Sequence, residues 1–207
     1  MAVVASTVLK PLSGKRSLAE ERMKNLASVL GKYGANAKTT NFVAGEYTGC
    51  IGLIRSYPDF KTASSGLGKL ANDPEYIALR NSRETDPAGE ILVSRNVGRI
   101  VFGEAKWSNY PVSMVRKYKI SRTDVPDALS ILESVKKITD KEEVNLRAIL
   151  PVLSEDMTRM LVSYQYKTLD HFGEALDGSG SSEEMQDLIR KANKFSSLQS
   201  SSLMVVF

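Results

Sequence analysis

The chain has 207 residues, of which 42% are hydrophobic and 25% charged, a composition typical of soluble globular proteins. Its single cysteine, Cys50, excludes an intramolecular disulfide framework and fits a reducing compartment, so we expect a cytoplasmic protein. The net charge of +4 is mild, and the basic residues are scattered without a base-stacking aromatic motif, which argues against a nucleic-acid partner. No stretch approaches the roughly 18 apolar residues that a membrane span requires.

The first half of the chain predicts a strand, a helix, a hairpin of two strands, two helices and a closing strand. Ser17 and Glu20 form a capping-box pattern at the start of the first helix, and Gly34 follows its last apolar residue. Asp73 and Pro74 mark the start of the third helix as N-cap and first helical residue. The predicted elements are a strand over 3–9, a helix over 17–34, strands over 38–44 and 47–55, helices starting at 60 and 74, and a strand over 99–102.

The second half repeats this order. A capping-box pattern at Ser181 and Glu184 precedes its last helix, and Asp170 is a plausible cap for the helix that opens at His171. The predicted elements are a strand over 112–120, a helix over 123–138, strands over 146–153 and 159–167, the two helices, and a strand over 203–207. In the last strand, alternation places Val205 and Phe207 on one face.

A pattern repeated at about 100 residues predicts two copies of one small domain. The join falls near 103–110, which gives domains 1–105 and 106–207. A βαββαβ order is the ferredoxin-like unit, an antiparallel sheet with helices on one face. Because the strands carry apolar residues on both faces, we expect the two sheets to cover each other. The predicted fold class is α+β, with two tandem ferredoxin-like domains packed sheet to sheet as an intrachain α+β barrel.

The element order, the duplication and the short helix that opens with Asp73-Pro74-Glu75-Tyr76 resemble the dimeric α+β barrel superfamily. This superfamily includes cofactor-free monooxygenases of antibiotic biosynthesis, stress-responsive barrel proteins, NIPSNAP-like proteins and haem-binding chlorite-dismutase-like proteins. The resemblance implies that one chain forms what its relatives form as a homodimer. A further homodimer through the outer surfaces stays open. Function varies within the superfamily, so an activity carried over from it rests on analogy.

Three side chains on the central strands are candidate ligand contacts. Arg116 alternates with apolar residues, and if that face lines a barrel cavity its guanidinium could bind an anionic or carbonyl-bearing ligand; otherwise it reaches solvent at an edge. Tyr164 and Tyr166 share one face of their strand and could donate hydroxyls to a ligand, or serve as core aromatics. We expect all three to point to the barrel side, where a cavity can hydrate polar groups.

His171 is the only histidine, which excludes a His-rich zinc site and a histidine pair for acid–base chemistry. It is a candidate axial haem ligand, as the haem-binding branch of the superfamily implies, or simply a residue at a helix start. Cys50 lies in a predicted strand, where a buried apolar role is favoured over a nucleophilic one. We expect no metal site and no cofactor.

The sequence leaves three functions open. The first is binding of a small, partly apolar molecule in the barrel, and the second is a cofactor-independent monooxygenase-like activity, implied by the resemblance. The third is a structural or protein-interaction module with a filled core. A polar-tipped cavity of roughly 300 Å³ or more favours the first two, and a filled barrel favours the third.

Overall fold

The computed structural model describes residues 1–93 and 96–207, and over these it has eight strands and six α-helices. The first half comprises β1 (Val3–Pro11), α1 (Arg16–Gly31), β2 (Asn36–Gly45), β3 (Ile51–Tyr57), α2 (Phe60–Leu70), α3 (Pro74–Thr85) and β4 (Gly89–Phe102). The second comprises β5 (Val112–Ile120), α4 (Val125–Thr139), β6 (Asn145–Leu153), β7 (Arg159–Tyr166), α5 (Leu169–Asp177), α6 (Glu183–Ala192) and β8 (Ser196–Val206). The predicted α+β order is therefore confirmed.

All eight strands form one closed antiparallel barrel in the order β1-β3-β2-β8-β5-β7-β6-β4. Within it, β2-β3-β1-β4 and β8-β5-β7-β6 each have the strand neighbours of a ferredoxin-like sheet. The two sheets meet along both edges, where β4 pairs with β6 and β2 pairs with β8. Hydrogen bonds therefore join the two sheets at both of their edges. Closure leaves neither sheet with an edge strand that is unpaired along its whole length.

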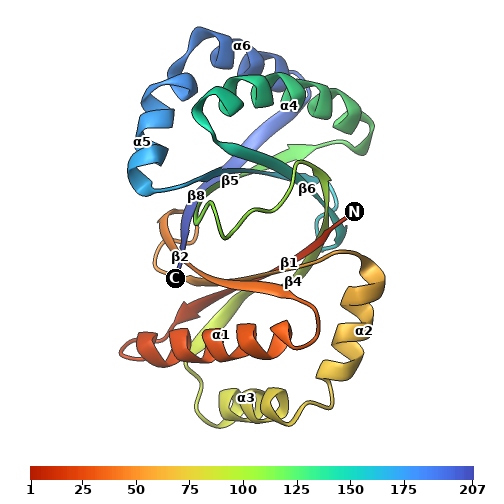
Figure 1. The fold of residues 1–207 in the computed structure, drawn as a ribbon, viewed down its shortest axis with the longest axis vertical. Coiled ribbons are helices and arrows are strands. Elements are labelled where there is room, and N and C mark those ends of the chain that lie inside the picture. Colours follow the sequence, from red (N-terminus) through yellow and green to blue (C-terminus); the bar gives the residue numbers. More distant parts are fainter.

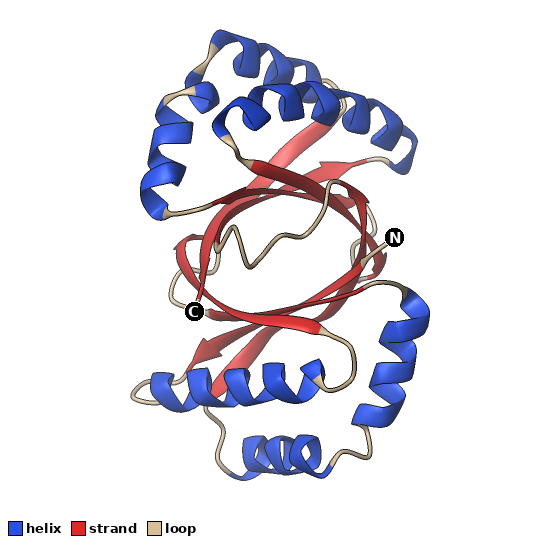
Figure 2. Cartoon of the chain, in the orientation of Figure 1, coloured by secondary structure: helices blue, strands red, loops and turns tan.

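The helices form two outer layers with the barrel between them (Figure 1). Helices α1, α2 and α3 cover the first sheet, and α4, α5 and α6 cover the second (Figure 2). Each layer has its own apolar core, and a third cluster lies inside the barrel, formed by Val4, Ile54, Ile100, Trp107, Ile149 and Met204. Trp107 belongs to the connector between β4 and β5, which crosses the barrel opening in Figure 2.

Helix starts follow the sequence closely in α3 and differ in α1. Asp73 caps α3 by accepting from the backbone N–H of Tyr76 at 2.8 Å, which confirms the predicted cap. By contrast, α1 begins at Arg16 with Lys15 as N-cap and without a side-chain cap, so the Ser17–Glu20 capping box was wrong. The Glu20 carboxylate pairs instead with Arg16 one turn earlier, at 2.9 Å.

The last two helices are each capped by a neighbour of the predicted residue. Thr168, and not Asp170, caps α5 by accepting from the N–H of His171 at 3.0 Å. Ser182, and not Ser181, caps α6. The hydroxyl of Ser181 donates to the Leu176 carbonyl at 2.8 Å, which closes the preceding turn. Neighbouring Ser, Thr and Asp side chains offer the same cap chemistry, and only the path of the loop selects one of them.

Two strand boundaries also differ from the prediction. Strand β4 starts at Gly89, ten residues before the predicted strand over 99–102, because it pairs with β1 along its length as well as with β6. Strand β3 starts at Ile51 and not at Tyr47, because residues 46–49 form a wider turn closed by the Gly49 N–H donating to the Phe42 carbonyl. This wider turn places Glu46 and Tyr47 at one mouth of the barrel.

The predicted strand over 203–207 is the end of the longer β8, which is hydrogen-bonded to β2 and β5. Met204 and Val206 pack in the cluster inside the barrel, whereas Leu203 and Val205 pack under the second helix layer. Alternation therefore divides residues 203–206 between two cores, and Phe207 packs in a third one, beneath the first helix layer.

Candidate ligand site inside the barrel

The barrel encloses a cavity of about 150 Å³. Its middle is apolar and is lined by Val4, Ile54, Val115, Ile149, Leu161 and Met204. This volume is half of the roughly 300 Å³ at which typical ligand pockets begin, and it is comparable to a cavity that holds a benzene molecule. The barrel is therefore neither filled nor spacious, and a single-ring compound is the size that it admits.

Strand alternation decides which side chains reach the cavity. On β7, Arg159, Leu161 and Ser163 line it, while Tyr164 and Tyr166 lie in the core beneath the second helix layer. Arg159 and Ser163 are four residues apart, which corresponds to roughly 13 Å along a strand. The cavity therefore has two distinct ends along this wall.

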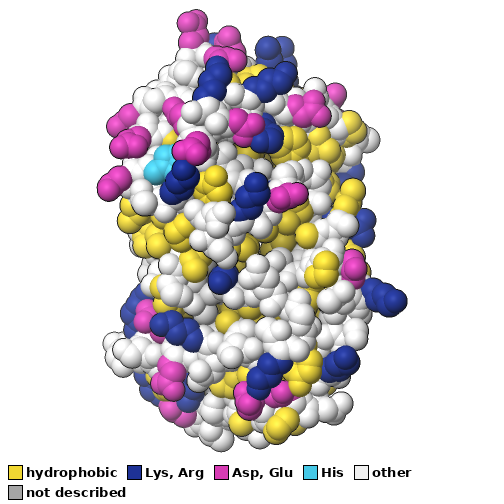
Figure 3. Space-filling view, in the orientation of Figure 1, with side chains coloured by type: hydrophobic (Ala, Val, Ile, Leu, Met, Phe, Trp, Pro, Cys, Tyr) yellow, Lys and Arg dark blue, Asp and Glu magenta, His cyan; other side chains and the backbone are white. Residues whose placement is uncertain are grey.

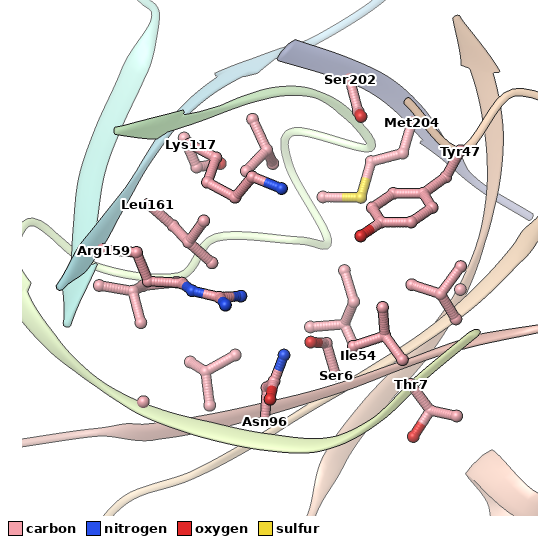
Figure 4. Close-up of a pocket in the computed structure, with 18 of the residues that line it drawn as sticks. Ser6, Thr7, Tyr47, Ile54, Asn96, Lys117, Arg159, Leu161, Ser202 and Met204 are labelled. Carbon is pink, nitrogen blue, oxygen red and sulfur yellow. The ribbon is translucent and has the colours of Figure 1, made fainter. Parts of the chain in front are cut away.

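One end is an open, charged mouth. Lys117 and Arg159 extend toward the cavity there, together with the hydroxyl of Tyr47 (Figure 4). The Lys117 ammonium donates to both carboxylate oxygens of Glu46 at 3.0 Å, and the Ser200 hydroxyl donates to the same carboxylate at 2.6 Å. Burial raises the pKa of Glu46, but these hydrogen bonds outweigh it and hold the pKa below its usual value. Lys117 therefore has a counter-charge at this mouth.

Arg159 is paired as well. Its Nε lies 3.2 Å from the Asp156 carboxylate, on the loop that precedes β7. The same mouth opens into an outer depression of about 440 Å³ that Glu46, Lys117, Arg159 and Ser200 share with the cavity. A ligand that enters from solvent passes these two paired cations first.

The opposite end holds a buried guanidinium without a counter-charge. Arg147 on β6 is only 2% exposed, and its Nε and Nη1 have no hydrogen-bond partner among the described residues. Its guanidinium carbon lies 4.0 Å from the centroid of the Trp107 ring, which covers one of its faces. The residue across the sheet is Ser163, whose hydroxyl is engaged with Ser113 at 2.7 Å. The only acid among the described cavity-lining residues is Glu46, at the other end.

This arrangement is costly in free energy unless something is bound. Burial lowers the pKa of Arg147 to about 9, so the side chain is still charged at neutral pH. An ion withdrawn from water without a partner carries a penalty of several kcal/mol, and an arene face returns only about 2 kcal/mol of it. An anion at this end of the cavity would supply the missing partner.

Replacement of Arg147 by methionine is therefore expected to stabilise the ligand-free protein at pH 7. Loss of the buried charge is worth up to about 4 kcal/mol and loss of the stacking on Trp107 costs about 2 kcal/mol, which leaves a net gain of up to about 2 kcal/mol. Urea unfolding of both proteins measures this difference. Arg99→Met is the matched control, because Arg99 is exposed and stacks on Phe60 with 5.2 Å from guanidinium carbon to ring centroid. Its unfolding free energy should change by less than about 0.5 kcal/mol.

The stability advantage of Arg147→Met should depend on pH. The pKa of Arg147 is lower in the folded protein, about 9, than its ordinary value of 12.5, so the unfolded chain binds more protons between these two values. The penalty is fully present below pH 9 and fades as the pH rises above it. The advantage of Arg147→Met over the parent should therefore shrink above pH 9. An advantage that stays constant up to pH 10.5 would contradict the account.

None of the four residues proposed from the sequence lines this cavity. The expected orientation of Arg116, Tyr164 and Tyr166 was wrong, because it is their neighbours on the strands, such as Val115 and Ser163, that face inward. The guanidinium carbon of Arg116 lies 5.4 Å from the centroid of the Tyr164 ring. Burial alone would lower the pKa of Arg116, but the nearby tyrosines outweigh it and raise the pKa. For Tyr164 and Tyr166, burial has the opposite effect and raises the pKa of the hydroxyl.

His171 does not reach the cavity either. Its Nδ1 accepts from the backbone N–H of Lys167 at 3.1 Å, and its Nε2 lies 2.7 Å from the carbonyl oxygen of Glu142. Since Nδ1 acts as an acceptor, Nε2 carries the proton, and no lone pair is left for iron. The residues present therefore do not fit axial haem ligation by His171. This histidine joins the start of α5 to the loop before β6.

Cys50 is buried at the end of the turn before β3, and burial raises the pKa of its thiol, which disfavours the thiolate. Across residues 1–93 and 96–207, no three of the His, Cys, Asp and Glu side chains are placed to hold a metal ion. In the same ranges, no helix is long and apolar enough to cross a bilayer. On the face in Figure 3, basic and acidic side chains are interspersed.

Sequence reasoning missed Arg147, although a signal was present. Arg147 is the one charged residue in the predicted strand over 146–153, between Leu146 and Ala148. A charge in a run of apolar residues on a central strand is the pattern that was noticed at Arg116. Only the barrel decides which of the two arginines faces the cavity.

The comparisons with known proteins rest on structure alone, since no family model and no curated protein sequence matches the chain. An anthrone oxidase-like protein aligns over 100% of this chain and 91% of its own, with a TM-score of 0.66 and 10% identity. A provisionally assigned monooxygenase from Fusobacterium nucleatum aligns over 99% and 92%, with a TM-score of 0.65 and 10% identity. A heme-degrading enzyme from Listeria monocytogenes aligns over 97% and 98%, with a TM-score of 0.53 and 8% identity. At these identities, the chain shares the ferredoxin-like α+β fold of these proteins.

Proposed function

We propose that this protein binds a small, partly apolar molecule inside its barrel. The observation that carries the proposal is the cavity of about 150 Å³, which is apolar in the middle and polar at both ends. Ligand pockets combine an apolar lining with a few placed polar groups in this way. We also propose that 1–105 and 106–207 are two ferredoxin-like repeats, each contributing one wall of the site. The matching strand order of the two sheets supports this division.

Toluene is a suitable first probe, because it is neutral and close in size to the cavity. A tenfold excess over its dissociation constant should stabilise the folded state by about 1.4 kcal/mol, which raises the melting temperature by about 3 °C or more. Val115→Phe, which places an aromatic ring in the middle of the cavity, should abolish this shift. The measurement is a thermal melt with and without toluene.

The matched control is Val43→Phe, the same substitution at a residue of β2 that is 46% exposed. It should melt with the same toluene shift as the parent. A toluene shift that survives in Val115→Phe would contradict binding inside the barrel, and so would a parent protein that binds neither toluene nor a polar single-ring compound such as benzoate or benzamide.

A cofactor-independent monooxygenase-like enzyme is the second candidate, and Arg147 is the observation that favours it. A buried positive charge stabilises the deprotonated form of a phenol or enol. Such an anion can itself supply all four electrons that dioxygen takes up when a ring C–H of the phenol becomes a carbonyl, so that phenol and dioxygen give a quinone and water. The cavity volume restricts this candidate to single-ring substrates.

Oxygen uptake in the presence of 1,3,5-trihydroxybenzene tests this second candidate. Uptake should require the folded protein and fall by about 100-fold in Arg147→Met. Uptake no faster than with heat-denatured protein would reject the enzyme and leave the binding proposal intact.

A further inference from the structure

The charge balance of the barrel interior identifies what kind of ligand it would hold, and this step rests on the proposed binding function. Among the residues that the structure describes, three cations line the cavity, namely Lys117, Arg159 and Arg147. Glu46 lies 3.0 Å from the first and Asp156 lies 3.2 Å from the second. Arg147 alone has no acidic partner among the described residues. One positive charge inside the barrel, that of Arg147 at the end opposite the mouth, is therefore not balanced by a negative charge.

The unpaired cation is built into the site rather than left on a surface. Its side chain is 2% exposed, Nε and Nη1 lack partners, and the Trp107 ring holds one face of the guanidinium at 4.0 Å. The Ser113 and Ser163 hydroxyls bond each other, and the Asn145 amide donates to the Gln165 carbonyl oxygen at 2.7 Å. Nε2 of Gln165 lacks a partner, but it is a donor and cannot pair with a guanidinium. A planar guanidinium fixed in this way presents a fork of donors that matches a carboxylate or a similar oxyanion.

The apolar lining beside Arg147 specifies the rest of the ligand. On β6, the next inward residue after Arg147 is Ile149, and Ile149 pairs across the sheet with Leu161. Val115 and Met204 complete this part of the lining. An acidic group at Arg147 thus places its attached hydrocarbon among aliphatic side chains, where burial stabilises it.

We propose that the ligand of this barrel is a small amphiphilic monoanion, with its acidic group against Arg147 and a body of single-ring size in the apolar middle. A monoanion matches the one missing charge. It enters past Lys117 and Arg159, whose pairing with Glu46 and Asp156 keeps them from being the final anion site. Trp107, which stacks on the Arg147 guanidinium, lies at the far end.

Benzoate and benzamide are the probes, because they have nearly the same size and differ by one charge. Titration calorimetry at pH 7 and constant ionic strength should show benzoate binding the parent protein about tenfold more tightly than benzamide, since hydrogen bonds to an ionised group are about twice as strong. In Arg147→Met, benzoate should bind about 30-fold or more weakly than in the parent, while benzamide changes far less. Arg147→Lys keeps the charge and should recover part of the benzoate affinity.

Arg99→Met and Arg116→Met are the matched controls, because both arginines stack on aromatic rings outside the cavity. Both variants should bind benzoate like the parent. Equal affinity for benzoate and benzamide in the parent would overturn the anion assignment and leave the proposed binding function standing. A benzoate preference that survives in Arg147→Met would assign the charge to the mouth cations and overturn the role of Arg147. If benzoate, benzamide and toluene all fail to bind, the proposed function fails with it.

Discussion

Removal of residues 203–207 is expected to leave the protein insoluble or unfolded. These residues end β8, which pairs with β2 on one side and β5 on the other, so their loss opens the barrel at one of its two sheet junctions. Met204 is 4% exposed, and its neighbours pack in cores on both sides of the sheet. Each buried apolar side chain is worth about 1.5–3 kcal/mol, so several together approach the roughly 5–15 kcal/mol that stabilises a whole domain.

The soluble fraction on expression and a circular-dichroism melt measure the result. Removal of Phe207 alone is the control, because it takes away one partly buried side chain and its two hydrogen bonds to Thr39 but leaves the pairing of Met204 and Val205 in place. That variant should stay folded with a lower melting temperature. A protein without 203–207 that melts within a few degrees of the full chain would show that this segment does not hold the barrel closed.

Substitution of Gly103 by alanine should destabilise the protein at the junction between the connector and β6. Gly103 has a φ of 67°, in the left-handed region, and an added Cβ would lie 2.0 Å from the Leu146 carbonyl oxygen and 3.1 Å from the Cα of Arg147. The backbone of β6 must therefore move. Left-handed strain costs about 1–2 kcal/mol and the steric conflict about 1–3 kcal/mol more.

Gly49→Ala separates the two contributions. Gly49 has a φ of 83°, but an added Cβ there has no atom within 4 Å, so this variant carries the backbone strain alone. Urea unfolding should show a larger loss of stability for Gly103→Ala than for Gly49→Ala. Equal losses of stability in the two variants would mean that the connector and β6 can move apart at no cost in free energy. Because Arg147 is next to the point of conflict, benzoate affinity should also fall in Gly103→Ala and not in Gly49→Ala.

Much of the fold could be predicted from the sequence because local patterns determine it. The 3.6-residue periodicity of apolar residues indicated helices, and an Asp-Pro pair set the start of α3. The strand over 112–120 was predicted with its final boundaries. Boundaries that depend on pairing were missed, as in β4, where Gly89 to Gly98 joins the barrel through β1. Local propensity carries no information about a distant partner strand.

The side of the barrel on which each residue lies was decided only by the tertiary structure. In a strand that is buried on both faces, alternation separates two sets of side chains but does not say which set faces the cavity. Arg116 and Arg147 both interrupt apolar strands, and the sequence treats them alike. Pairing in the closed barrel turns Arg116 toward Tyr164 under the helices and Arg147 toward the interior, where Trp107 from the connector covers it. Short-range sequence patterns thus determined the order of helices and strands. The unpaired charge of Arg147 lies inside the barrel only because strands far apart in the chain close around it.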